Sequence, residues 1–88
     1  MIAVVLPSLL ATQAGGRKRF EVDGPTVEAA LRALPIADLL FDDTGALRPL
    51  VNVYVDSVDV RAADGVQTAL HDGQTVRIVA AVAGGSGG

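Results

Sequence analysis

The sequence predicts an α+β fold in which a β-sheet packs against one main helix. Residues 51–55 alternate valines with Asn52 and Tyr54, which is the period of a strand with one buried face. Residues 27–34 place apolar side chains at the helical spacing i, i+3, i+4 and i+7. Half of the chain is hydrophobic but it contains only two Phe, one Tyr and no Trp, so its core must be aliphatic. Such a core suits strands with a helix laid across them.

The chain has the length and composition of one folded domain. Its 88 residues fall short of the length at which a second hydrophobic core forms, and they are too hydrophobic for a disordered chain. We expect the folded domain over residues 1–80. Residues 81–88 are rich in glycine and small side chains, which bury too little surface to fold, so we expect a flexible tail there.

The first two predicted strands form a hairpin. Residues 1–6 are rich in β-branched side chains, and Pro7 ends a run that suits the middle of a sheet. The Gly15-Gly16 pair tolerates the positive φ of a turn, and residues 18–22 alternate polar and apolar positions. We therefore expect an opening β-hairpin, with the Leu9-Leu10 pair continuing into the core.

The main helix has recognisable start and stop signals. Either Asp23 or Thr26 caps its beginning, and Pro35 limits it. Residues 36–41 then predict a further helical turn, followed by an exposed loop over residues 42–45. The remaining strands are expected at residues 51–55, 58–60 and 75–80, which completes the order ββαβ(β)β.

The charge of the chain argues against a nucleic-acid-binding protein. The formal net charge is -3, whereas phosphate recognition needs clustered cations. The basic run Arg17-Lys18-Arg19 is either a solvated turn between strands or a docking patch for an acidic partner. The apolar run from Ile2 to Leu6 is far shorter than the roughly 20 residues of a membrane span. We expect a soluble, cytoplasmic protein that binds neither nucleic acid nor membrane.

The sequence contains few candidates for side-chain catalysis, metal binding or nucleotide binding. The chain contains no Cys, which excludes disulfides, thiolate nucleophiles and cysteine-based zinc sites. His71 precedes the turn residues Asp72-Gly73 and is interpreted as an exposed turn residue rather than a general base. The acidic residues lie beside turn signals without the spacing of a metal site. No glycine pair begins a phosphate-binding loop, so we predict no bound cofactor and expect a partner to bind ATP.

The terminal glycines have two interpretations. Glycine-rich ends are common in disordered tails. A chemical interpretation is that a C-terminal carboxylate on an arm without side chains can enter a narrow channel of a partner enzyme, where any Cβ would collide with the walls. There the carboxylate can be activated as an acyl-adenylate.

Several segments together resemble the β-grasp (ubiquitin-like) sulfur carriers. The segments are Val51-Asn52-Val53-Tyr54-Val55 followed by Asp59-Val60-Arg61, His71-Asp72-Gly73-Gln74-Thr75-Val76-Arg77-Ile78, and Val82-Ala83-Gly84-Gly85. The family includes the molybdopterin synthase small subunit, the thiamine-pathway carrier and the actinobacterial cysteine-biosynthesis carrier, which is the branch that the chain resembles most. The resemblance covers almost the whole chain and implies a β-grasp fold, with a mixed sheet packed against one main helix.

The resemblance implies a protein co-substrate rather than an enzyme. In the family, an adenylating enzyme uses ATP to activate the terminal glycine, and sulfur then displaces AMP to leave a thiocarboxylate. The thiocarboxylate donates sulfur to an acceptor synthase in the cysteine, molybdopterin or thiamine pathway, which requires no Cys in the carrier. The alternatives are a non-covalent β-grasp interaction module and a ubiquitin-like protein modifier.

The chain departs from the family pattern at its end. The family ends at the Gly-Gly that matches Gly84-Gly85, whereas Ser86-Gly87-Gly88 follows here. We expect Gly88, preceded by Gly87, to be the reactive end. The alternatives are that a processing protease exposes Gly85, or that residues 86–88 are not native.

The resemblance also implies a partner-binding surface. In the family this surface is an apolar patch on the exposed face of the sheet. In this chain it is expected to include Tyr54 and residues next to the tail such as Val82.

Overall fold

Five strands form one mixed sheet in the computed structural model, which describes residues 1–80. The strands are β1 (Ile2–Val5), β2 (Arg19–Val22), β3 (Val51–Val55), β4 (Val58–Asp59) and β5 (Thr75–Ala80). Their spatial order is β2-β1-β5-β3-β4. β1 and β5 run parallel, and the other neighbouring pairs are antiparallel. The expected β-grasp arrangement is confirmed.

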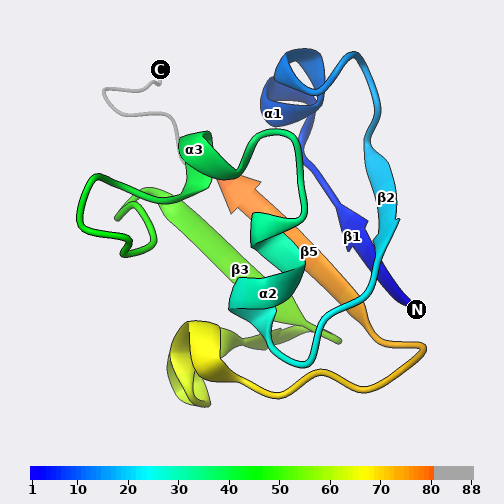
Figure 1. Cartoon of the computed structure of the whole chain (residues 1–88), viewed down its shortest axis with the longest axis vertical. Coiled ribbons are helices and arrows are strands. Elements are labelled where there is room, and N and C mark those ends of the chain that lie inside the picture. The colour runs from blue at the N-terminus through cyan, green and yellow to red at the C-terminus, as the bar shows by residue number, and fades with distance from the viewer. Residues whose placement is uncertain (81–88) are drawn as a thin grey trace.

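The helices lie over one face of the sheet (Figure 1). They are α1 (Ser8–Gln13), α2 (Val27–Arg32) and α3 (Ala37–Leu40), and two 3-10 turns follow at Val60–Ala62 and Gly65–Gln67. Of the two candidate caps, Thr26 begins α2, because its hydroxyl accepts the backbone N–H of Ala29 at 3.3 Å. Within residues 1–80, no helix has the length and apolar character to cross a membrane.

The core lies between α2, α3 and the covered face of the sheet. Alternation along β3 and β5 sends one set of side chains inward, where they meet the apolar stripe of α2. The largest fully buried side chains are Leu31, Leu40, Ile78, Val4, Val27, Val53 and Val76. All of them are aliphatic, as the composition predicts.

The connection from β1 to β2 differs from the expected hairpin. The two strands do pair antiparallel, but α1 lies between them. Leu10 is buried by this helix, whereas Leu9 is 57% exposed, so only one of the two leucines enters the core. The helix forms because residues 8–13 favour helix, and the N–H of Gly16, at φ 87, closes its end by donating to the carbonyl of Ala11.

The other elements follow the sequence pattern closely. Strands β3 and β5 occupy the predicted residues 51–55 and 75–80, and α3 occupies the predicted further helical turn. The companion strand β4 ends one residue early, because Asp59 accepts the N–H of Arg61 at 2.8 Å and turns the chain into a 3-10 helix. β1 lies inside the sheet, between β2 and β5, as its β-branched composition indicates.

The aliphatic core predicts a large effect of shortening its central side chain. We expect Leu31→Ala to lower the free energy of unfolding by about 2–5 kcal/mol, because Leu31 is 0% exposed and its removal leaves a cavity. Urea unfolding followed by circular dichroism measures this change. Leu9→Ala is the matched control, with an expected change within about 0.5 kcal/mol. Equal losses in the two variants would contradict the assignment of the core.

Candidate functional site

The last strand carries the chain to the tail from inside the sheet. β5 is hydrogen-bonded to β1 on one side and to β3 on the other, and Ala80 at its end is in register with Val51. Val76 and Ile78 are buried under the helices, while Arg77 and Val79 lie on the open face. Residues 75–77 pair with β1 and residues 76–80 pair with β3, so the last three residues of the strand are held in the sheet by β3.

The predicted reactive residues follow this strand. Val82, Gly84, Gly85, Gly87 and Gly88 lie outside the residues that the structure describes. Their assignment as reactive or partner-binding residues stays a prediction. The same holds for the expected division into a folded domain and a flexible tail.

Tyr54 lies on the open face of the sheet. Residues 51, 53 and 55 of β3 are buried, while Asn52 and Tyr54 are half-buried on the opposite side, as the alternation predicts. Tyr54 is in register with Arg77 on β5 and with Asp59 on β4. Tyr54 therefore lies between β5 and β4 on this face, and its role in partner binding stays a prediction.

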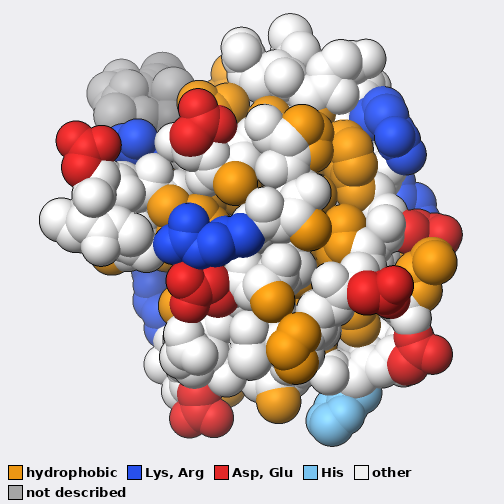
Figure 2. Space-filling view, viewed as in Figure 1, with side chains coloured by type: hydrophobic (Ala, Val, Ile, Leu, Met, Phe, Trp, Pro, Cys, Tyr) orange, Lys and Arg blue, Asp and Glu red, His pale blue; other side chains and the backbone are white. Residues whose placement is uncertain are grey.

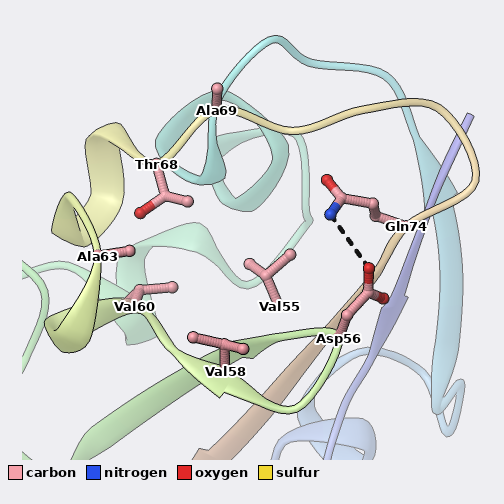
Figure 3. Close-up of a pocket in the computed structure, with 8 residues that line it drawn as sticks. All are labelled: Val55, Asp56, Val58, Val60, Ala63, Thr68, Ala69 and Gln74. Atoms are coloured by element: carbon pink, nitrogen blue, oxygen red, sulfur yellow. Dashed lines mark hydrogen bonds between the residues drawn. The ribbon is translucent and has the colours of Figure 1, made fainter.

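A small pocket lies at the other end of the sheet and offers no reactive group. It has a volume of about 240 Å³, and its lining residues are Val55, Asp56, Val58, Val60, Ala63, Thr68, Ala69 and Gln74. Its carboxylate, on Asp56, already accepts Gln74 Nε2 and the backbone N–H of Thr75, each at 3.1 Å (Figure 3). Val55 pairs with Val76, four residues before Ala80, so the pocket is about 13 Å along the strand from the tail.

Other side-chain chemistries find no support in the described part of the chain. Within residues 1–80, no three His, Cys, Asp or Glu side chains lie close enough together to hold a metal ion. His71 is exposed in the turn before β5, and its backbone N–H donates to Gln74 Oε1 at 2.7 Å. On the helix-covered side, acidic and basic side chains are interspersed rather than gathered into a site (Figure 2).

Two carboxylates on the helix-covered side are held in hydrogen-bond networks. The Arg32 and Gln67 side chains donate to Glu28, and these contacts lower the pKa of that carboxyl. The hydroxyl of Thr44 donates to Asp42 Oδ1 at 2.6 Å and lowers the pKa of Asp42, with help from backbone N–H groups. The Glu28 network connects α2 with the 3-10 turn that contains Gln67, and the Asp42 network closes the loop of residues 42–46. Both networks therefore contribute to the stability of the fold.

Within residues 1–80, the structure shows no set of side chains arranged for nucleophilic or acid–base catalysis. The described residues provide a rigid sheet, an open face and a strand that leads outward, but they bring no nucleophile together with a base. A carboxylate at the end of the tail is a group that a partner enzyme can activate.

Comparison with known proteins decides the family. The sequence model of the ThiS family matches residues 4–85, which run from within β1 through the other four strands to the Gly84-Gly85 pair. The chain belongs to the ThiS family. The predicted β-grasp sulfur carrier is confirmed, and with it the role of a protein co-substrate rather than an enzyme.

Relatives within and near the ThiS family support this assignment over nearly the whole chain. The sulfur carrier protein CysO of Mycobacterium tuberculosis is 37% identical over 91 residues, which cover 96% of this chain and 98% of the relative. Its crystal structure matches 93% of this chain and 100% of its own, with a TM-score of 0.82 and 34% identity.

Two further solved structures are similar. A chain of the Amycolatopsis orientalis BexX/CysO complex has a TM-score of 0.84 and 32% identity, over 97% of this chain and 100% of that one. The crystal structure of the small archaeal modifier protein 1 of Haloferax volcanii has a TM-score of 0.73 and 28% identity, over 96% and 98%.

The sequence pattern does not relate Arg77 to the basic run. Alternation along residues 75–80 places Arg77 on the face opposite the core. Only the register between the strands shows which side chains lie beside it on that face. That register brings it level with Arg19 of the basic run. The run itself is exposed before and at the start of β2.

The lowered pKa of Asp42 predicts a pH dependence of stability. A carboxyl with a lowered folded pKa stabilises the fold fully above its unfolded pKa, near the ordinary value of 3.8, and that stabilisation disappears as the pH falls through the folded pKa. We expect Asp42→Asn to lower stability at neutral pH and to reduce the loss on acidification. Urea unfolding between about pH 6 and pH 2.5 tests this.

The neighbouring Asp43→Asn is the matched control for this test. Asp43 is exposed and takes no part in the hydrogen bonds that the Asp42 carboxylate accepts. A pH profile that Asp42→Asn leaves unchanged, or that both variants change equally, would contradict a specific role of Asp42.

Proposed function

We propose that the chain carries sulfur as a thiocarboxylate on its C-terminal glycine. An adenylating partner attaches AMP from ATP to the carboxylate with release of pyrophosphate, and a sulfur nucleophile then displaces AMP. The carrier delivers this sulfur, at the oxidation level of sulfide, at an acceptor synthase, and water supplies the oxygen that restores its carboxylate. The observation that supports this most directly is the ThiS family match, which extends past the last strand through Gly84-Gly85.

The absence of Cys is consistent with sulfur carried on the terminal carboxylate rather than on a side chain. A carrier that used a side chain would need a thiol, and the chain has none. The described residues offer no nucleotide cradle either, so ATP would be bound by the adenylating partner and the carrier itself would hold no cofactor.

The acceptor is proposed to belong to a biosynthetic route among those that use such carriers. Cysteine, molybdopterin and thiamine biosynthesis share the same activation chemistry. The 37% identity to CysO of Mycobacterium tuberculosis favours the cysteine route, and the BexX/CysO complex of Amycolatopsis orientalis is precedent for a related carrier bound to a protein partner.

The reactive residue is proposed to be Gly88, with Gly87 before it. The family match ends at Gly85, which supports the alternative that a protease removes residues 86–88 and exposes Gly85. Both candidates place a glycine carboxylate on an arm without bulky side chains.

Removal of the last residue tests the reactive end. We expect the chain without Gly88 to fold normally but to form no thiocarboxylate with the adenylating partner, ATP and sulfide. Intact mass spectrometry detects the product as a gain of one sulfur minus one oxygen. Normal conversion of the truncated chain would contradict Gly88.

A chain ending at Gly85 is the companion variant. Its conversion, combined with no conversion of the full chain, would assign the reaction to Gly85 and imply processing. No conversion of any form would contradict the thiocarboxylate function itself.

Tyr54 is proposed to contact the adenylating partner. The ring is half-buried on the open face and lies one strand away from β5. We expect Tyr54→Ala to raise the KM for the carrier several-fold with little change in kcat, because it removes ground-state docking area. Val58→Ala is the control, because Val58 of β4 is 55% exposed and pairs with Val55, whose side chain lies on the opposite face of the sheet from Tyr54. An unchanged KM for Tyr54→Ala would contradict the contact.

A protein modifier is the second candidate. The similarity to the small archaeal modifier protein 1 of Haloferax volcanii favours it. A modifier joined through its terminal glycine to lysines would appear as conjugates of higher mass in its own organism. Their detection, with no thiocarboxylate on the free chain, would favour this candidate.

A further inference from the structure

A single row of side chains crosses the open face of the sheet on all five strands. Register places Arg19 of β2 opposite Val5 of β1, and Val5 opposite Arg77 of β5. The same row continues from Arg77 to Tyr54 of β3 and from Tyr54 to Asp59 of β4. Two arginines therefore flank Val5 on one side of the face, and an aspartate ends the row on the other.

Both arginines keep their charge available to a partner. Arg77 is exposed and forms no ion pair with a carboxylate within residues 1–80. The Arg19 side chain is 63% exposed, and its contact with Glu21 is 4.0 Å long, at the limit of an ion pair. Among the described residues, neither guanidinium is therefore neutralised by a close carboxylate.

The spacing of the two arginines suits more than one carboxylate. Neighbouring strands are about 4.8 Å apart, so the Cα atoms of Arg19 and Arg77 are about 10 Å apart, with Val5 half-buried between them. Guanidinium groups bind carboxylates through paired N–H donors. A partner segment with two carboxylates about 10 Å apart, and an apolar side chain over Val5 or Tyr54, matches this row.

The row also lies next to the origin of the tail. Arg77 precedes Ala80 by three residues, or about 10 Å along the strand. A protein that occupies the row would therefore have its surface beside the point where residues 81–88 leave the sheet. The enzyme that receives the tail is the partner for which this position is useful.

We propose that Arg19 and Arg77 bind an acidic segment of the adenylating partner across the open face, with Asp59 at the other end setting the orientation of that segment. This inference rests on the proposed function, because it takes the receiving enzyme as the partner. The charge of the whole chain, -3, disfavours a nucleic acid as the occupant, since a polyanion would be repelled by the rest of the surface.

Calorimetric titration of the full-length chain with the adenylating enzyme tests the proposal. We expect Arg77→Gln and Arg19→Gln each to raise the Kd about tenfold, the loss of one charge-assisted contact. The wild-type Kd should rise with salt, and its salt dependence should be weaker in either variant. Arg77→Lys should retain the salt dependence with part of the affinity.

Arg17→Gln is the matched control within the same basic run. Arg17 lies 4.5 Å over the ring of Phe20, and Phe20 pairs with Val4 on the covered side of the sheet. Its loss removes the same charge away from the row, and we expect a Kd close to that of the wild type. Melting curves confirm that each variant is folded.

The outcomes separate the docking surface from the chemistry. An unchanged Kd for Arg77→Gln and Arg19→Gln, or an equal loss in Arg17→Gln, overturns the proposal. Binding that needs Arg77, without ATP–pyrophosphate exchange by the wild type, supports the surface and overturns the adenylation. No binding of the wild type overturns both. Arg77-dependent binding of a single-stranded oligothymidylate, with unchanged affinity for the enzyme, would reassign the row to nucleic acid and overturn the proposal.

Discussion

The fold depends on the insertion of the last strand into the middle of the sheet. β5 pairs with β1 in parallel and with β3 antiparallel, and it is the only strand among the described residues that joins the two halves. Without it, β1–β2 and β3–β4 would be separate two-stranded ribbons, which are marginally stable in water. Its pairing with β1 also closes most of the chain into a loop, an entropic cost that burial of Val76 and Ile78 helps to offset. The chain end is therefore fastened by the interactions that complete the core.

Because β5 has two different faces, it connects the core with the surface and the tail. Val76 and Ile78 pack under the helices, while Arg77 and Val79 alternate with them on the open face. A change in register by one residue would turn the arginine into the core, so the hydrophobic pattern that stabilises the fold also fixes which side chains a partner meets. The segment proposed to carry the reactive glycine follows this strand in the sequence. One short element therefore contributes to the core, carries an arginine of the proposed docking row and precedes the proposed reactive end.

Sequence reasoning recovered what depends on local periodicity. The alternation of residues 51–55 and 75–80 gave both central strands with correct ends, and the spacing of residues 27–34 gave the main helix. It missed α1, because six residues without a side-chain cap carry too little helical signal beside two glycines that suggest a tight turn. It also left Arg19 and Arg77 unrelated, because strand register between residues 58 positions apart is a non-local property. The reactive terminal glycine rests on the family resemblance rather than on periodicity, and it stays a prediction because residues 81–88 lie outside the described residues.

The length of chain beyond β5 sets how far the carrier can deliver its carboxylate. An extended residue spans at most about 3.6 Å, so residues 81–85 reach about 18 Å from Ala80 and residues 81–88 reach about 29 Å. If the adenylating enzyme docks on the proposed row, its surface lies about 10 Å from Ala80, so most of the length of the arm can extend into its channel. Such docking also raises the effective concentration of the carboxylate at the active site without a new contact to the glycines. If the channel is about as deep as the longer arm, Gly88 is the residue that fits it, and a shallower channel would require the end at Gly85.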